Sequence, residues 1–315
     1  MIKEILLRRK IPLLLVLALT FGVLGGLADY LGPAVRVDEN ELHPPALSQQ
    51  ETAGSASAPA VSAAGAVLIR ADTGAILFEK DAEKRLYPAS TSKIMTALVV
   101  LEILEELSLG ADSRVIVPAE AAGLEGSSIY LKAGEKVMME ELLYGMMLQS
   151  GNDAATAAAI CAGGNLRNFV ARMNRKAEEL GCTGTHFTNA CGLFDENHYT
   201  TAKDLACIAA AAMQREDFRR IASASRWQSA ESERNFYNKN KTVRQYEGGD
   251  GVKIGFTRAS GRTLVASATR GDVSLIAVVL RDSNWFADAY AMLDYGFAVT
   301  GAGRAAAEKG AQMPS

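Results

Sequence analysis

The chain has 315 residues, of which 49% are hydrophobic and 22% are charged. This composition supplies enough apolar side chains for one large domain or two closely packed ones, and it excludes a disordered or collagen-like chain. The net charge of −3 provides no basic field that would attract a polyphosphate backbone, so we expect no nucleic-acid partner.

The first 28 residues predict export. Basic residues at positions 3, 8, 9 and 10 precede an apolar run from Ile11 to Leu27, and Gly26-Leu27-Ala28 offers a small-x-small cleavage site. Residues 1–28 are therefore predicted to be either a cleaved signal peptide or a retained membrane anchor. In both cases the rest of the chain lies outside the cytoplasm, with membrane contact only through this segment.

Residues 29–63 are rich in Ala, Ser and Pro and show no sustained apolar period, which is typical of a flexible linker. A single folded domain is predicted over residues 64–302. Residues 303–315 are predicted to be a short polar tail.

The folded part begins with "AVLIRADTGAILFEKD", two β-rich runs around Asp72-Thr73-Gly74 that predict a hairpin. Next, "YPASTSKIMTALVVLE" predicts a helix that runs to about Leu107. Over residues 112–236 apolar side chains recur mostly at spacings of three and four, which predicts helices. Finally, "GDGVKIGFT", "RTLVASATR" and "VSLIAVVLRD" predict three strands, and "NWFADAYAMLDYGFAV" predicts a closing helix.

Strands at both ends of the domain, with helices between them, predict an α+β fold. We expect one antiparallel sheet, built from both chain ends and flanked by helices, together with a helical insertion. A groove between the two parts would be the natural place for a site.

Ser90 and Lys93 stand at the start of the predicted helix. Side chains three apart share a helix face, so the hydroxyl and the ammonium group can hydrogen-bond. A lysine activates a serine nucleophile when burial or a neighbouring cation lowers the lysine pKa, and the helix N-terminus favours negative charge beside the serine. The alternative interpretation is that Ser90 only caps the helix.

Two further tripeptides combine suitable groups. Ser150-Gly151-Asn152 interrupts two helical stretches and presents a hydroxyl for proton relay and an amide for a substrate carbonyl, although an ordinary turn explains it equally. Lys253-Ile254-Gly255 lies on a predicted strand, where the glycine permits close approach of a substrate backbone and the lysine attracts an anion. The alternative there is a strand end with a solvated lysine.

The four cysteines, at positions 161, 182, 191 and 207, form no C-x-x-C pair, so we expect no disulfide framework, although one bridge is possible. The three histidines form no H-E-x-x-H motif. We expect no metal and no cofactor.

The order S-x-x-K, S-x-N and K-x-G resembles the signature of penicillin-recognising serine enzymes. Longer stretches, including "GSSIYLKAGEKVMMEELLYGMMLQSGNDAA" and "GDGVKIGFTRASGRTLVASATR", resemble the D-alanyl-D-alanine carboxypeptidases of serine peptidase family S11, the low-molecular-mass penicillin-binding proteins. The resemblance runs from about Gly65 to Phe297. It implies a β-lactamase/DD-peptidase-like fold for the predicted domain.

The resemblance also implies a two-step acyl transfer that removes the terminal D-alanine from peptidoglycan stem peptides at the cell wall. Ser90 would attack the carbonyl between two D-alanines, Lys93 would accept its proton, and water would hydrolyse the acyl-enzyme. By the same resemblance Ser150 would relay protons to Lys253 and Asn152 would hold the acyl side's amide. The backbone N–H groups of Ser90 and Phe256 would form the oxyanion hole, and β-lactams would trap Ser90 covalently.

The chain departs from the family pattern in three places. Ile254 replaces a threonine whose hydroxyl helps to bind the terminal carboxylate, so we expect that role to fall to Lys253, beside Gly255, and to Arg281 at the end of the last strand. Cys191 replaces the histidine of the family's N-P-H-G-L, which we interpret as a packing change. The chain ends soon after the closing helix, so we expect any anchoring to come from the N-terminus.

Two alternatives stay open. Ile254 is compatible with a non-catalytic penicillin-binding sensor or wall-binding module, which covalent labelling without D-alanine release would identify. A class A β-lactamase is less well supported, because the one E-x-x-x-N, from Glu231 to Asn235, carries Arg234 at a position that is apolar in that family. No G-x-S-x-G elbow occurs, which argues against other serine hydrolases.

Overall fold

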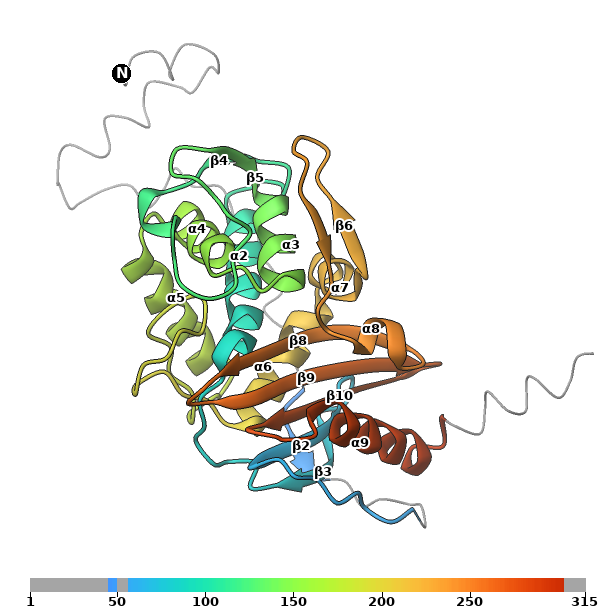
Figure 1. Cartoon of the computed structure of the whole chain (residues 1–315). Helices are drawn as coiled ribbons and strands as arrows, with labels where there is room; N and C mark the ends of the chain where they lie inside the picture. The colour runs from blue at the N-terminus through green and yellow to red at the C-terminus, as the bar shows by residue number, and fades with distance from the viewer. Residues whose placement is uncertain (1–44, 50–55, 303–315) are drawn as a thin grey trace, which may run out of the picture. The chain divides into compact units, whose positions relative to one another are not determined.

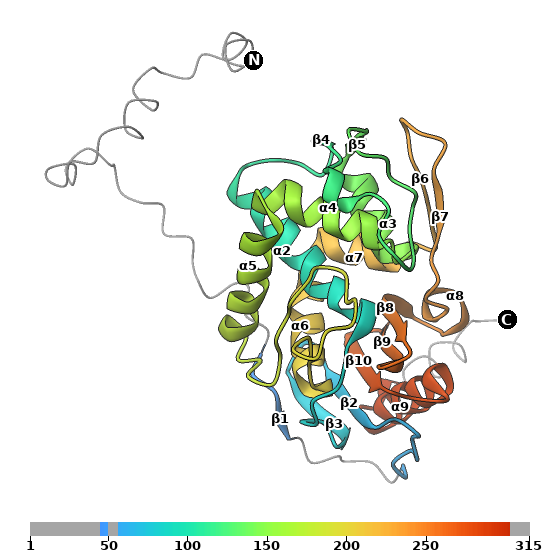
Figure 2. The same ribbon diagram turned by 60° about the vertical axis from the view of Figure 1, so that its left-hand side comes forward.

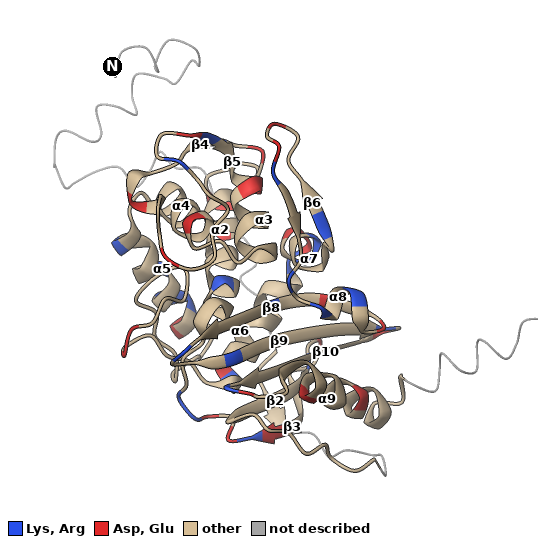
Figure 3. Ribbon diagram, in the orientation of Figure 1, with Lys and Arg blue, Asp and Glu red and all other residues tan. Residues whose placement is uncertain are grey.

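The computed structural model describes residues 45–49 and 56–302 (Figure 1). The predicted export segment over residues 1–28 and the predicted tail over residues 303–315 lie outside the described residues. Among the helices that are described, none combines the length and the apolarity needed to cross a membrane. Basic and acidic residues are interspersed over the described helices and strands (Figure 3).

The centre of the fold is a six-stranded sheet with the order β1-β3-β2-β10-β9-β8. Its strands are β1 (Ser48–Gln49), β2 (Gly65–Arg70), β3 (Ala75–Lys80), β8 (Gly249–Thr257), β9 (Gly261–Arg270) and β10 (Val273–Leu280). All neighbours are antiparallel except β1, which pairs parallel with β3. The predicted hairpin and the sheet built from both chain ends are confirmed.

The two faces of the sheet are covered by different helices because successive side chains of a strand point to opposite sides. On β2, Ala66 and Leu68 pack in a core with α9 (Trp285–Val299). Val67 and Ile69 belong instead to the larger core on the opposite face. There α6 (Ala202–Gln214) packs on β2 and β10, and Figure 2 shows it between the sheet and α2.

The helical part surrounds α2 (Lys93–Glu106), which follows the 3-10 turn η1 (Ala89–Ser92). Nearly every residue of α2 is buried, as expected for a helix that is apolar on all sides. It packs against α3 (Met139–Leu148), α4 (Asn152–Gly163), α5 (Leu166–Glu179), α6 and α7 (Glu216–Ser223).

The predicted helical block also contains two small hairpins. They are β4 (Arg114–Ile116) with β5 (Lys136–Met138), and β6 (Arg226–Gln228) with β7 (Asn235–Tyr237); the short helices η2 (Ala119–Ala121) and α8 (Thr242–Gln245) complete the chain. A three-residue strand is too short to establish a period-two pattern. The mostly helical prediction for residues 112–236 therefore missed these strands.

Described parts of the predicted linker make contact with the sheet, with α9 and with the segment that joins them. Besides the β1 pairing, Lys80 Nζ donates to the Val61 carbonyl at 2.7 Å, and Ser62 N donates to Asp288 Oδ2 at 2.5 Å. Ser62 Oγ also donates to Asp288 and to Asp282. These contacts extend the ordered packing to residues that precede position 64.

A buried ion pair fastens the β6–β7 hairpin to α3. Glu141, which is 1% exposed, accepts hydrogen bonds from Arg234 Nη1 at 2.5 Å and Ser229 Oγ at 2.7 Å. Glu231, by contrast, forms an ion pair with Arg114 at the surface. The Glu231–Asn235 stretch is therefore part of the β6–β7 hairpin, with Glu231 engaged at the surface. This placement argues against the β-lactamase alternative, which needed Glu231 as the glutamate that activates water.

Candidate active site

Ser90 lies in a strained turn. Ala89 before it has a φ of +50°, in a region that residues with a Cβ rarely adopt. Gly192 (φ +83°) packs so closely on this turn that a Cβ there would lie 1.9 Å from the Ala89 carbonyl oxygen. The N-cap positions of η1 and α2 are Pro88 and Ser92, and neither makes a side-chain cap hydrogen bond. Capping therefore does not explain Ser90.

Lys93 is fully buried and its ammonium nitrogen contacts Ser90 directly. Nζ lies 3.0 Å from Ser90 Oγ, 2.8 Å from Asn152 Oδ1 and 2.6 Å from the Cys191 carbonyl oxygen. Burial lowers the pKa of Lys93 to about 8; the nearby Asp153 carboxylate opposes this shift and the charge of Lys239 adds to it.

The turn between α3 and α4 delivers Ser150 and Asn152. Ser150 is buried with a φ of +64°, and Asn152 is the first residue of α4. Asn152 Nδ2 donates to the Glu125 carbonyl at 2.7 Å, which directs the amide oxygen toward Lys93. The tripeptide is a turn between helices, as one interpretation expected, but neither polar residue is its cap.

Asp153 holds the neighbouring loop in place. Its buried carboxylate accepts hydrogen bonds from the backbone N–H groups of Ile129 and Leu131 at 3.1 Å and from Ser128 Oγ at 2.6 Å. The loop carries Tyr130, which has a φ of +62° and is 83% exposed. Nothing in the sequence pattern indicated this role for Asp153.

Strand β8, at the edge of the sheet, brings Lys253 and Gly255 to the Ser90 turn. A Cβ on Gly255 would lie 2.9 Å from Ser90 N and 3.0 Å from the Pro88 carbonyl oxygen. The glycine thus permits close approach of the strand to the serine turn itself. Phe256 follows with its side chain 64% exposed, and Ile254 packs at the margin of the core beneath α9.

Lys253 is also buried, with Nζ donating to the Ile254 carbonyl at 3.1 Å. Burial lowers its pKa well below the usual range, and the charges of Lys93 and Lys239 act in the same direction. Lys239 donates to the Gln149 carbonyl at 2.7 Å, beside the α3–α4 turn. Lys239 was missed, because nothing in the sequence distinguishes it from a surface lysine.

A loop between α5 and α6 supplies the carbonyl that contacts Lys93. Asn189 Oδ1 accepts from the N–H groups of Cys191, Gly192 and Leu193 at 3.1, 2.7 and 3.2 Å and so fixes its shape. Cys191 thus contributes its backbone oxygen to the site. We interpreted Cys191 from the sequence only as a packing change, and that interpretation did not identify this contact.

His198 contacts the turn that carries Ser90, through Ser92. Its Nδ1 accepts from Thr188 N at 3.1 Å, so the proton resides on Nε2, which donates to Ser92 Oγ at 2.7 Å. Burial lowers the pKa of His198 to about 4, and the ring is neutral near neutral pH. Ser92, which His198 contacts, lies two residues after Ser90. This supporting role of His198 was not recognised from the sequence.

Arg281 follows β10 with a φ of +51° and packs beside Gly261 at the β8–β9 turn. Both β8 and β10 are antiparallel to β9, so Arg281 and Phe256 lie toward the same end of the sheet. Within the described residues no three His, Cys, Asp or Glu side chains group as a metal site.

The site combines a serine with a buried lysine at the edge of a sheet that helices cover. This combination defines a class of serine enzymes, and solved structures of that class are similar to this chain. The fold is similar to penicillin-binding protein 6B from Escherichia coli, with a TM-score of 0.73 at 30% identity over 79% of this chain and 81% of that one. It is also similar to the Streptomyces K15 DD-transpeptidase, with a TM-score of 0.71 at 31% identity over 77% and 100% of the two chains.

Residues 52–284 match the family model of Peptidase_S11, D-alanyl-D-alanine carboxypeptidase. The chain is 37% identical to the D-alanyl-D-alanine carboxypeptidase DacF of Bacillus subtilis over 243 residues, which are 75% of this chain and 62% of DacF. It is 34% identical to DacC of Escherichia coli, over 81% of this chain and 65% of DacC. The chain thus spans less than two thirds of each of these relatives, and it belongs to family S11.

Proposed function

We propose that the protein is a serine D-Ala-D-Ala carboxypeptidase that removes the terminal D-alanine from peptidoglycan pentapeptide stems through an acyl-enzyme on Ser90. The observation that carries this proposal is the buried Lys93 amine 3.0 Å from Ser90 Oγ, with a pKa lowered to about 8. Family membership supports the reaction, and the proposed catalytic domain is residues 64–302.

The hydrogen bonds of Lys93 suit a general base. A neutral amine has two N–H donors and one lone pair. With the donors directed at Asn152 Oδ1 and the Cys191 carbonyl, the lone pair faces Ser90 Oγ and accepts the hydroxyl proton as the oxygen attacks the substrate carbonyl. Asn152 and Cys191 are thus positioning groups that select the reactive orientation of the amine.

The oxyanion that forms in this attack requires two N–H donors. The proximity of β8 to Ser90 N supports the pair formed by the Ser90 and Phe256 backbones. Ser150, buried in the turn beside Asn152, would relay the proton toward the leaving D-alanine and Lys253. Water would then hydrolyse the ester, with Lys93 again as the base.

We propose that the buried Lys253, rather than a threonine hydroxyl, recognises the terminal carboxylate of the substrate. The pKa of Lys253 is lowered in the free protein, and a bound carboxylate would favour its charged form. Asn152 would contact the acyl side, while Arg281 and Lys239 would add positive charge.

Residues 1–28 would direct export or anchor the chain, and residues 29–63 would join this segment to the catalytic domain. The enzyme would then act on the extracytoplasmic face of the membrane or in the cell wall, with β-lactams as covalent inhibitors. Ile254 favours a second candidate function, that of a penicillin-binding sensor in which penicillin acylates Ser90 but no D-alanine is released.

The test is D-alanine release by the full chain from a peptide that ends in D-Ala-D-Ala, beside Ser90→Ala. Release by the wild type alone supports the carboxypeptidase. Labelling of Ser90 by a fluorescent penicillin without release supports the sensor, and neither release nor labelling refutes both.

A further inference from the structure

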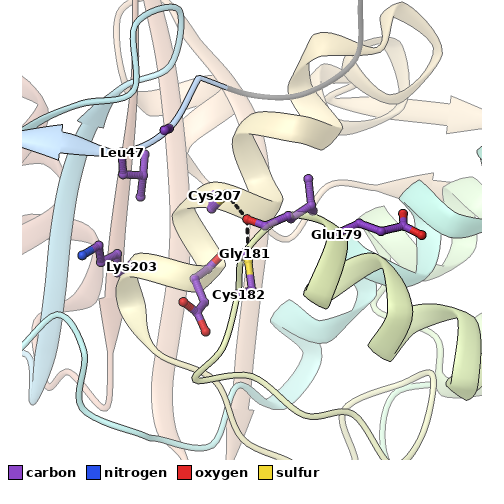
Figure 4. A pocket seen from close by; sticks show the side chains of 9 residues that line it. Leu47, Glu179, Gly181, Cys182, Lys203 and Cys207 are labelled. Atoms are coloured by element: carbon purple, nitrogen blue, oxygen red, sulfur yellow. Dashed lines mark hydrogen bonds between the residues drawn. The ribbon is translucent and has the colours of Figure 1, made fainter. Parts of the chain in front are cut away.

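Two cysteines outside the proposed active site lie against each other. Cys182 follows α5 and Cys207 lies on α6, and both thiols donate to the Leu180 carbonyl oxygen, at 3.9 and 3.4 Å (Figure 4). Cys182 Sγ is also 3.5 Å from the Asp204 carbonyl oxygen. Two thiols that share one acceptor are neighbours in the fold, and rotation of their side chains is the movement needed to bring the sulfurs within bonding distance.

The pair is accessible from one side. The two cysteines line a pocket of about 450 Å³ with Leu47, Glu179, Lys203 and Asp204 around them. Cys182 is buried, whereas Cys207 is only half-buried. Access is therefore better to Cys207.

The remaining cysteines have other surroundings. Cys161 Sγ lies 3.6 Å from the Ile116 carbonyl oxygen, and Cys191 Sγ lies 3.5 Å from Asn189 Oδ1 in the proposed active site. The structure therefore selects one pairing from the six that four cysteines allow.

The electrostatics of the pair are asymmetric. The interaction between the two thiols lowers the pKa of Cys207 and raises that of Cys182. Burial acts against the charged form of both thiols. Cys207 is thus the more readily ionised thiol of the pair, and it is also the more accessible one.

We propose that Cys182 and Cys207 form a thiol–disulfide exchange site that closes to an intramolecular disulfide when it meets a low-molecular-mass disulfide. The Cys207 thiolate attacks one sulfur of that oxidant, forms a mixed disulfide and releases one thiol. The Cys182 thiolate, after losing its proton to water, then attacks the Cys207 sulfur and releases the second thiol. Two electrons pass from the protein thiols to the oxidant.

This proposal rests on the proposed export of the chain, because disulfides form and persist outside the cytoplasm. The bond would tie the start of the α5–α6 loop to α6, which packs on α2. The same loop carries the Cys191 carbonyl that contacts Lys93. Closing a loop of this length should raise the Tm by on the order of 10 °C.

The experiment uses the purified full chain, equilibrated with oxidised or reduced glutathione, alkylated and mapped by mass spectrometry. We expect a linked peptide pair, lighter by two hydrogens, that joins Cys182 to Cys207, and the predicted rise in Tm. Cys182→Ser and Cys207→Ser should abolish both changes, whereas Cys161→Ser should retain both. Free alkylated Cys182 and Cys207 in excess oxidised glutathione would overturn the proposal, and this result needs no variant.

Fluorescent penicillin labelling of the same samples separates this proposal from the proposed function. Labelling without the linkage overturns the disulfide site alone. The linkage without labelling supports the disulfide site and counts against the proposed enzyme.

Discussion

The pH dependence of acylation tests the role of Lys93 most directly. With a pKa of about 8, roughly 1% of the amine is neutral at pH 6, about 9% at pH 7 and about 50% at pH 8. The second-order rate of acylation by penicillin should therefore rise ~10-fold from pH 6 to 7 and ~5-fold from 7 to 8. It should level off above about pH 9.

Asn152→Asp alters this profile in a predictable direction. It places a carboxylate where the Asn152 Oδ1 atom now lies, 2.8 Å from Lys93 Nζ. An opposite charge at this range raises a lysine pKa by ~1 to 3 units. The rise in the acylation rate should shift to higher pH by the same amount, with a loss of at least ~10-fold at pH 7.

The assay is time-resolved labelling with a fluorescent penicillin between pH 6 and 10. Asn152→Ala is the matched control, because it removes the acceptor and adds no charge, so its profile should not move to higher pH. A thermal melt of each variant at each pH confirms folding. The reasoning is refuted if the wild-type rate keeps rising tenfold per pH unit beyond pH 9, or if the profile of Asn152→Asp coincides with that of the wild type.

Four further results are expected. Gly255→Ala should reduce acylation by at least ~100-fold and lower stability by ~1 to 3 kcal/mol, because its Cβ would lie 2.9 Å from Ser90 N; normal labelling would contradict this. Ile254→Thr should lower KM for the D-Ala-D-Ala peptide, since it introduces a hydroxyl next to Lys253 in the chain; if KM and penicillin affinity are both unchanged, the hypothesis that Ile254 weakens binding is refuted. The folded state disfavours His198 protonation, so stability should fall by about 3 kcal/mol as the pH drops from about 6.5 to about 4. Urea unfolding of His198→Gln should show a smaller loss over this window, and an equal loss would contradict the assignment. Arg234→Met leaves Glu141 buried without its charge partner and should cost ~3 to 5 kcal/mol by urea unfolding, whereas Glu141→Leu combined with Arg234→Met should recover much of it; a mild effect of the single change would show that the pair is not stabilising.

Local patterns in the sequence determined much of the fold. The β2–β3 hairpin, the strands β8 to β10 and the helix α2 each carry a period or turn signal within a few residues, and the structure has them where expected. The same holds for Ser90 and Lys93, because a spacing of three on a helical turn brings the two side chains together whatever surrounds them.

The tertiary structure decided the environment of that pair. Asn152 and the Cys191 carbonyl come from 59 and 98 residues after Lys93, and their contacts depend on how α4 and the α5–α6 loop pack on α2. Burial of Lys93 and Lys253, which lowers their pKa, is likewise a property of the packed core. So is the Cys182–Cys207 juxtaposition, which no sequence spacing predicts. A local pattern specifies which side chains share one helix or strand. The electrostatic field around a buried lysine, by contrast, is the sum of contributions from elements that meet only in the folded protein.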